Sequence, residues 1–408
     1  MKKLMILGAG SGQIDIISKA RARGLYVIVV SPYGDYPGLK IADCTYDLDV
    51  RDEGAILAVA MKEKIDGIIT DQTDMAMRTV AYVAEQMGLP GIGYECAKLF
   101  TDKSAMRRKS EELGLPTIKS AVTTTCAEAE AFLEKLGKPA IIKPVDNQGS
   151  RGIYKIESDS DLRKFYSKAQ EFSKSKQVII EQYIDGDEYE VNSIVINGEE
   201  HTLCCGDLTM FQLPGIFASM YRLYPSCRDA AEVKRLLQLN KDTIEGFGLV
   251  NGISHSEYRV DRDGTPYLIE AAARGGGAHV SSDIIALQTG FDTSEYLIDC
   301  ALGISHGELT FDTEQCHCGT FSFYLPAGKV VAVEGVADAI DLPYIRGNDL
   351  AEIELGMITK PYSDKTGRYI SVLVGDDREN LMEHFNEYRS LIKIKVMTEE
   401  GLKGPVWE

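Results

Sequence analysis

Two glutamates, Glu257 and Glu270, could bind one metal ion, because a predicted hairpin places them opposite each other. Asp263-Gly264 separates two alternating apolar runs, which is typical of a tight hairpin turn. With these two residues as the turn, pairing runs 262/265, 260/267 and 257/270, and the two Cβ atoms lie about 5 Å apart. Like charges so placed destabilise a sheet unless a cation lies between them, and Mg²⁺ shared with substrate phosphates fits. Two unrelated surface glutamates are the alternative.

A second set of residues could bind phosphate. Lys143 lies in the predicted strand 140–144, and the loop 146–152 is polar and contains glycines, so its backbone N–H groups could form an anion-binding nest. Arg151 adds a charge-assisted donor. No Gly-Lys-Ser/Thr sequence occurs, which excludes a Walker P-loop. Lys103 lies in the first turn of a predicted helix 102–113, where the helix dipole disfavours a cation unless an anion is bound. An ordinary hairpin loop and a solvated lysine are the alternatives.

Two further segments have the chemistry of a nucleotide site. The apolar strand predicted at 178–184 is followed by Glu188; its backbone could hold adenine, and the carboxylate could accept hydrogen bonds from ribose hydroxyls. Arg274 follows Glu270 by four residues and precedes three glycines. The arginine could stabilise developing negative charge, and the glycines allow a substrate to approach closely.

The strands and helices that must position these residues follow a pattern that predicts an α/β fold with an α+β central part. Short apolar strands alternate with helices near the N-terminus, which predicts a parallel sheet. From about 117 to 200 antiparallel strands accompany one helix, and beyond about 310 the pattern is mostly β. The predicted N-terminal strands are 4–7, 26–30 and 65–70, the helices between them are 13–23 and 53–64, and a C-terminal helix covers 378–391.

The glycines at 8, 10 and 12 follow the first strand, as in a dinucleotide-binding fingerprint. The fingerprint is incomplete, because Gln13 stands where the third glycine would fall and the second strand ends without an acidic residue. Asp71, Thr73 and Asp74 follow the third strand, at an end where α/β folds bind ligands; solvated acids are the alternative.

Composition narrows the classes of partner and compartment. A net charge of -18 argues against nucleic acid, and no apolar stretch is long enough to predict a membrane span. Nine cysteines without regular spacing favour reduced thiols in the cytoplasm. Cys316-His317-Cys318 lacks a second Cys/His pair, which disfavours zinc and leaves its role open. The aromatic segment 210–224 could line an acyl pocket or form a core strand pair. The oligomeric state is open, with a homodimer as one option.

The order of these parts resembles the ATP-grasp superfamily over about residues 1–305. The resemblance implies a Rossmann-like region at 1–95, an ATP-grasp domain at 96–310 with a lid at about 117–190, and a small, mostly β region at 311–408.

One departure from the family pattern concerns the metal site. Many members carry asparagine two residues after the second metal glutamate, where this chain has Ala272. Water would then fill that position, or a second metal would bind less tightly. The family roles are phosphate binding for Lys103 and Lys143, a mobile loop at Gln148, Gly149, Ser150, Arg151 and Gly152, adenine contacts from Glu181, Gln182 and Ile184, ribose binding by Glu188, Mg²⁺ binding by Glu257 and Glu270, and catalysis by Arg274 with Lys143.

The implied function is an ATP- and Mg²⁺-dependent ligase, with Mn²⁺ as an alternative metal. It would activate a small-molecule carboxylate as an acyl phosphate and join it to an amine. The Glu-x-Ala-Ala-Arg form and the region 367–394 look similar to L-amino acid ligases. The alternatives are an enzyme that uses bicarbonate or a nucleotide-pathway amine, like biotin carboxylase, carbamoyl-phosphate synthetase or the purine-pathway ligases, a nucleotide-binding protein without catalysis, and an NAD-dependent oxidoreductase. The identities of the acid and the amine are open.

Overall fold

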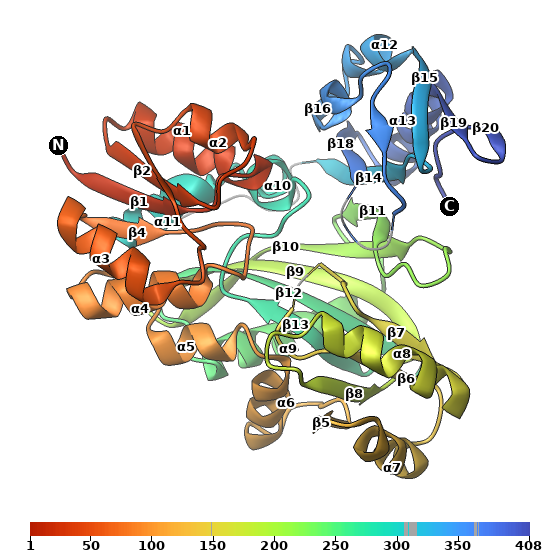
Figure 1. Cartoon of the computed structure of the whole chain (residues 1–408), viewed down its shortest axis with the longest axis horizontal. Coiled ribbons are helices and arrows are strands. Elements are labelled where there is room, and N and C mark those ends of the chain that lie inside the picture. The colour runs from red at the N-terminus through yellow and green to blue at the C-terminus, as the bar shows by residue number, and fades with distance from the viewer. Residues whose placement is uncertain (148, 306–308, 310–315, 363–364, 366) are drawn as a thin grey trace.

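The first region is a parallel sheet with helices on both faces (Figure 1). The computed structural model describes residues 1–147, 149–305, 309, 316–362, 365 and 367–408. Strand β1 is buried on both faces, with Leu4 and Ile6 in one core cluster and Met5 and Leu7 in another, which explains its continuous apolar sequence. The predicted parallel sheet is confirmed, and the sequence pattern missed one strand, β3. The sheet order is β3 (Cys44–Asp47), β2 (Tyr26–Ser31), β1 (Lys3–Leu7), β4 (Gly67–Ile69), with α1 (Ile14–Ala22), α2 (Pro37–Lys40), α3 (Glu53–Glu63), α4 (Met77–Met87) and α5 (Tyr94–Leu99).

The segment predicted to form the lid contains an antiparallel sheet that carries α7 and α8 on one face, and α7 is a second helix where the sequence predicted only one. Leu133 of α7 and Leu162 of α8 pack with Ile142 of the sheet in one buried cluster. The opposite face presents Lys143 and Glu181. The sheet order is β5 (Ser120–Thr123), β8 (Val178–Gln182), β6 (Ala140–Pro144), β7 (Tyr154–Ile156); the helices are α7 (Cys126–Leu136) and α8 (Asp159–Glu171), and α6 (Lys103–Glu112) precedes the lid.

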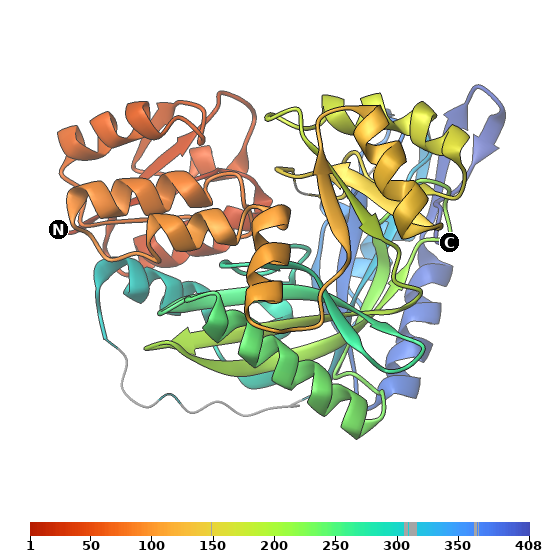
Figure 2. The same cartoon turned by 90° about the horizontal axis from the view of Figure 1, so that it is seen from below.

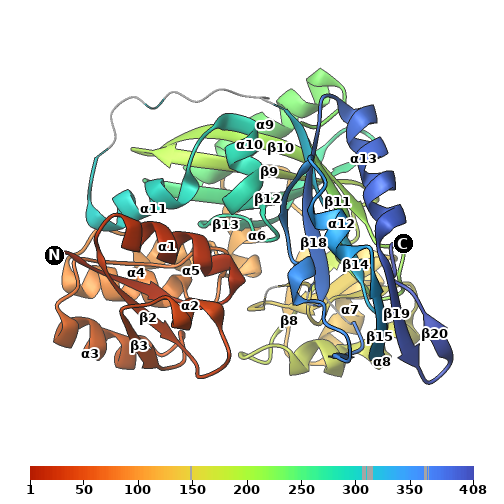
Figure 3. The ribbon, with the colours of Figure 1, turned by 90° about the horizontal axis from the view of Figure 1, so that it is seen from above.

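The central sheet runs without a break from the second predicted region into the third. The first region (red to orange) and the lid (yellow) both lie on one side of it (Figures 2 and 3). The sheet crosses the expected boundary near 310, because β11 pairs with β14. The three-part division of the chain stays a prediction. The order of the central sheet is β13 (Pro266–Ala272), β12 (Gly252–Asp261), β9 (Gly186–Ile196), β10 (Glu199–Met210), β11 (Ser219–Tyr224), β14 (His317–Tyr324), β18 (Arg368–Gly375), β16 (Ile345–Asn348).

A smaller four-stranded sheet completes the C-terminal part, and the predicted helix 378–391 is confirmed as α13. No helix in the described part of the chain is both long and apolar enough to cross a membrane. The sheet order is β17 (Ile358–Thr359), β15 (Gly328–Glu334), β19 (Lys393–Thr398), β20 (Gly401–Lys403), and the remaining helices are α9 (Ala230–Gly246), α10 (Ile285–Thr289), α11 (Thr293–Leu302), α12 (Val336–Ile340) and α13 (Arg378–Leu391).

We expect the folded protein to lose stability as pH rises, because His279 bridges two acids. Its ring nitrogens lie 2.9 Å from Asp283 and 3.0 Å from Asp349. Burial lowers the pKa of His279, but hydrogen bonds to Asp283 and Asp349 outweigh this and raise the pKa to about 10. A raised pKa stabilises the fold fully below the unfolded value of about 6.5, and this stabilisation is lost as pH rises towards 10.

Denaturant unfolding between pH 6 and 10 measures this effect. The slope for one proton cannot exceed about 1.4 kcal/mol per pH unit. Comparison with His279→Gln separates the contribution of His279 from that of other titrating groups. The free energy of unfolding of this variant should depend less on pH than that of the wild type. Parallel curves for the two proteins would contradict the assignment.

Candidate functional site

The hairpin places Glu257 directly opposite Glu270, as predicted, but by a different route. The expected two-residue turn is wrong: Asp261 N–H donates to Thr265 O and Gly264 N–H to Asp261 O, each at 3.0 Å. This is a three-residue loop, and Gly264 takes its left-handed position at φ 79°. The longer loop shifts the pairing by one residue, so that Val260 pairs with Pro266 rather than with Tyr267. A β-bulge then leaves Ile269 without a partner on β12, which brings Glu257 and Glu270 opposite each other again.

Glutamates form a row across three strands, because Glu190 of β9 lies beside Glu257, and Glu257 beside Glu270. A lysine from a different region neutralises each of the two hairpin acids. Lys365 Nζ lies 2.9 Å from Glu257 Oε1, and Lys103 Nζ lies 2.6 Å from Glu270 Oε1. Burial raises the pKa of Glu257, but the charge of Lys365 and a contact with His255 hold it well below its usual range. The predicted charge conflict is therefore real, and ammonium groups resolve it in this conformation.

Glu190 and its partners were missed from the sequence. Glu190 is fully buried, lies 2.9 Å from Arg222 Nε and accepts a hydrogen bond from Tyr224. The alternation of β9 could have placed Glu190 on the face of Glu188. Lys365 carried no sequence signal, because it comes from the C-terminal region more than 100 residues away.

Lys103 is buried rather than solvated, with 6% of its surface exposed. Asp102 caps α6 by accepting from Ala105 N–H, which directs Lys103 inward as the first helical residue. The ammonium also donates to Asn147 O at 2.8 Å, so it joins α6, the loop and the hairpin. Its conflict with the helix dipole is offset by Glu270.

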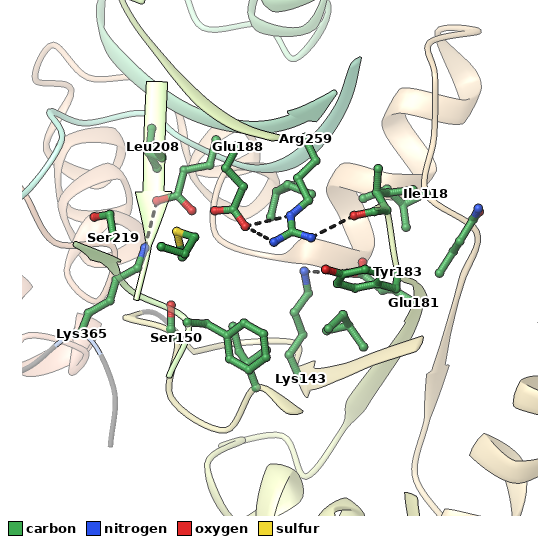
Figure 4. Close-up of a pocket in the computed structure, with 18 of the residues that line it drawn as sticks. Ile118, Lys143, Ser150, Glu181, Tyr183, Glu188, Leu208, Ser219, Arg259 and Lys365 are labelled. Carbon is green, nitrogen blue, oxygen red and sulfur yellow. Dashed lines mark hydrogen bonds and ion pairs between the residues drawn. The ribbon is translucent and has the colours of Figure 1, made fainter. Parts of the chain in front are cut away.

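Lys143 and Glu181 form the core of the lid side of the site (Figure 4). Lys143 Nζ lies 2.6 Å from Glu181 Oε2, and Arg107 Nε donates to Glu181 Oε1 at 2.9 Å. Burial, with the charges of Arg107 and Lys103, lowers the pKa of Lys143 despite Glu181. Burial raises the pKa of Glu181, but the charges of Arg107 and Lys143 lower it to about 2. The Glu181 side chain is therefore occupied by cations, which leaves only its backbone for the predicted adenine contact.

Glu188, the predicted ribose acid, is held by an arginine that no sequence motif indicated. Arg259 Nε donates to Glu188 Oε1 at 2.8 Å and Nη1 donates to Ile184 O at 2.9 Å. This ties the acid to the strand end where adenine was expected. Glu188 faces the same cavity as Lys143 (Figure 4).

The glycine loop between β6 and β7 contributes to the lining of this cavity. Ser150 lines it and adopts a left-handed φ of 61°, while Gly152 at φ 77° packs where a Cβ would clash with Phe172. Lys365 N–H donates to Gly149 O at 3.3 Å, so the C-terminal region contacts the loop. Gln148 lies outside the described residues. The aromatic segment 210–224 contributes Met210 and Phe217 to the cavity, while Phe211 and Ala218 pack in the core. The residues that line the cavity include Lys143, Ser150, Glu181, Gln182, Ile184, Glu188, Met210, Phe217, Arg222, Glu257, Arg259, Ile269 and Lys365.

Arg274 is engaged in an ion pair between regions. Its Nε and Nη2 lie 2.8 Å from the two carboxylate oxygens of Asp74. Asp71 is buried and accepts from Gly275 N–H at 2.8 Å and Ser281 Oγ at 3.2 Å, so neither acid is solvated. The two acids connect the end of β4 to the segment after β13. The catalytic role of Arg274 stays a prediction.

Ala272, at the position of the expected asparagine, pairs across the sheet with His255. His255 Nδ1 lies 2.8 Å from Asn192 Oδ1, and Nε2 lies 3.8 Å from Glu257 Oε1. Among the described residues no three His, Cys, Asp or Glu side chains gather to hold a metal alone. The carboxylates of Glu257 and Glu270 nevertheless suit Mg²⁺, which takes few protein carboxylates and completes its shell with phosphates and water.

The glycine loop after β1 is filled by a side chain. Gln13 Oε1 accepts from Gly10 N–H at 3.0 Å, and Gln13 Nε2 donates to Asp71 O at 2.6 Å. A Cβ on Gly8 would lie 3.1 Å from the same side chain. The space that a dinucleotide phosphate would need holds Gln13.

Residues 136–283 match the family model described as an ATP-grasp domain. The chain contains an ATP-grasp domain. This confirms the resemblance inferred from the order of motifs, and the glutamate row, Lys143 and the glycine loop all lie inside the matched range. Lys103 and Lys365, which bind the two hairpin glutamates, lie outside it.

Two relatives match the chain over 61% and 57% of its length. The formate-dependent phosphoribosylglycinamide formyltransferase of Methanococcus maripaludis is 27% identical over 258 residues, which are 61% of this chain and 65% of that protein. Alanine–anticapsin ligase of Bacillus subtilis is 27% identical over 57% of this chain and 53% of that protein. The chain thus spans about 65% of the length of the former relative.

Solved structures share the fold along the whole chain. The L-amino acid ligase from Bacillus licheniformis superposes with a TM-score of 0.82 at 22% identity, over 98% of this chain and 99% of that one. N5-carboxyaminoimidazole ribonucleotide synthetase from Thermotoga maritima gives 0.73 at 17% identity, over 97% and 99%. The mixed α/β fold class predicted from the sequence is confirmed.

Proposed function

We propose that this ATP-grasp protein is an ATP- and Mg²⁺-dependent ligase that activates a carboxylate as an acyl phosphate and joins it to an amine. The observation that carries the proposal is the convergence of Lys103, Lys143, Glu257 and Glu270 between the lid and the central sheet. Cations for phosphate and carboxylates for a metal come from different elements and meet in one place. The names of the two ligase relatives support the same reaction class.

The nucleotide would lie in the cavity of Figure 4. Backbone groups at 182–184 would hold adenine, and Glu188, positioned by Arg259, would accept the ribose hydroxyls. Lys143 and backbone N–H groups of residues 149–152 would bind phosphate oxygens, with Arg151 as an additional donor.

Glu257 and Glu270 would hold Mg²⁺, or Mn²⁺ in its place. Bound there, the metal would neutralise charge on the β- and γ-phosphates. The lysines on the two glutamates would then be released. Lys103 would be free to bind a phosphate oxygen, which is the role predicted for it.

The chain's own residues would support two steps. In the first, a carboxylate oxygen attacks the γ-phosphorus and ADP leaves, with Lys143 stabilising the developing charge. In the second, the amine attacks the acyl carbon and inorganic phosphate leaves. Arg274 would stabilise the oxyanion of this second step, held in place by Asp74. Closure of the loop 146–152 would exclude water from the acyl phosphate.

A second candidate uses formate, bicarbonate or a nucleotide-pathway amine. The similarity to formate-dependent phosphoribosylglycinamide formyltransferase favours it. The same cluster of phosphate- and metal-binding groups would serve, because only the acid and the amine differ. A cytoplasmic location and a homodimer stay predictions.

An ADP-release screen that crosses carboxylic acids with amines, read out by mass spectrometry of the products, tests the proposal. The acids include the L-amino acids, formate and bicarbonate. A product joined through an amide bond supports the ligase. ADP release with formate or bicarbonate and a phosphoribosylamine substrate alone supports the second candidate. Nucleotide binding without ADP release for any pair contradicts both.

A further inference from the structure

A second polar cavity, of about 390 Å³, adjoins the proposed phosphate site. It lies between the first region, the start of α6 and the loop after β6. Lys103 and Glu270 line one part of it, and Arg78 and Thr101 line another. Any molecule in this cavity would therefore reach the groups proposed to bind phosphate and metal.

Arg78 is fixed in this cavity by neutral groups. Its Nε donates to Thr101 Oγ1 at 2.6 Å and its Nη2 to Thr101 O at 3.3 Å. Thr101 Oγ1 is held in turn by donating to Ala97 O at 2.7 Å. This support pre-orients the guanidinium, which reduces the entropic cost of binding a further group.

The acids of this cavity are engaged elsewhere. Asp74 binds Arg274, Asp146 accepts from Ser173 Oγ and Ser175 N–H at 2.8 Å, and Glu53 accepts from Tyr94 at 2.9 Å. Within the described part of the chain, no carboxylate lies within ion-pair distance of Arg78. The chain has a net charge of -18, so its overall field does not favour anions. A half-buried arginine that no carboxylate neutralises is therefore a local site at which a bound anion would be stabilised.

We infer that Arg78 binds an anionic group, a carboxylate or a phosphate monoester, which a substrate carries in addition to the group that reacts. This inference rests on the proposed function and names its substrate class. The amine would be an amino acid or a phosphorylated amine, or the acid would carry a second anionic group. Thr101 is a positioning residue, since it acts through Arg78.

The kinetic test compares paired substrates that differ only in this charge. Each amine active in the screen is assayed as free carboxylate or phosphate and as the matching carboxamide or alcohol, and each active acid as diacid and monoamide. The charged member of one pair should have a kcat/KM roughly 10- to 100-fold higher, the range for a hydrogen bond between charged groups. Arg78→Met should abolish this preference and leave the uncharged partner unchanged, and Arg78→Lys should restore part of it.

Arg108→Met is the matched control. Arg108 also binds a hydroxyl, Ser104 Oγ at 3.1 Å, but is exposed outside this cavity. It should keep the wild-type preference. Equal losses for charged and uncharged partners in Arg78→Met, or a change confined to the KM for ATP, would overturn the inference.

A binding measurement separates this inference from the ligase proposal. Thermal unfolding in saturating ADP and Mg²⁺ is followed while malonate or inorganic phosphate is added. Either anion should stabilise the wild type and Arg108→Met more than Arg78→Met, and the better anion identifies the group. Equal stabilisation of all three proteins would overturn the role of Arg78, even where ADP release supports the ligase. Stabilisation through Arg78 without any ADP release would overturn the ligase and retain the anion site.

Discussion

Replacing Glu270 by glutamine is expected to lower ADP release by at least about a thousandfold, equivalent to about 4 kcal/mol, while the protein remains folded. Glu270 is one of only two hairpin carboxylates proposed to hold the metal, and Ala272 offers no oxygen to replace it. The amide cannot neutralise Mg²⁺ or the Lys103 ammonium, which lies 2.6 Å from Glu270. Steady-state ADP release with the best pair from the screen measures the loss, and circular dichroism checks the fold.

Glu95→Gln provides the matched control, because Glu95 also lies 2.6 Å from a lysine, Lys98, but on the surface, with 86% of its side chain exposed. Its turnover should equal that of the wild type. Mn²⁺ binding, followed by electron paramagnetic resonance in the presence of ADP, should weaken in Glu270→Gln alone. Unchanged turnover together with unchanged Mn²⁺ affinity would exclude Glu270 as a metal ligand.

Replacing Glu181 by glutamine is expected to destabilise the fold by about 3–5 kcal/mol, the usual cost of leaving a buried charge without its partner. Arg107 and Lys143 both bind Glu181, and the side chains of Arg107, Lys143 and Glu181 are each only 4% exposed. The variant would leave two cations in the core beside a neutral amide. Urea unfolding at pH 7 measures the change in the free energy of unfolding.

The pH dependence of the same group gives an independent check. The pKa of Glu181 lies at about 2, below the unfolded value of about 4.3, so its stabilisation is present above the unfolded pKa and is lost as pH falls towards 2. Glu181→Gln should show a flatter loss of stability in this range. Glu130→Gln serves as control, since Glu130 lies 2.6 Å from Arg163 in an exposed pair and should change stability by about 0–1 kcal/mol. Similar losses in both variants would contradict a special role for the buried triad.

Local patterns predicted only part of the elements of this fold, and helices such as α4, α7 and α9 were missed. The apolar strand at 4–7 and the amphipathic helix at 378–391 were predicted almost to the residue, because burial imposes a period that a short segment displays by itself. β3 was missed, since its alternate residues are only half buried at the edge of the first sheet. The hairpin register failed at the turn for a related reason: both a two- and a three-residue loop accept Asp-Gly, and only the packing of Leu268 and Ala271 into the core selects the bulged form.

The sequence by itself determined that Glu257 and Glu270 lie on the two strands of one hairpin and which segments have the chemistry for phosphate and metal. The hairpin of Glu257 and Glu270, Lys103 at the start of α6 and the loop after Lys143 follow from local spacing and propensity. The tertiary structure alone decided the partners of these charges. Lys365 on Glu257, Arg107 on Glu181, Arg259 on Glu188 and Asp74 on Arg274 all come from other elements. Electrostatic interactions depend on distance in space, and chain folding brings together charges that no local pattern relates.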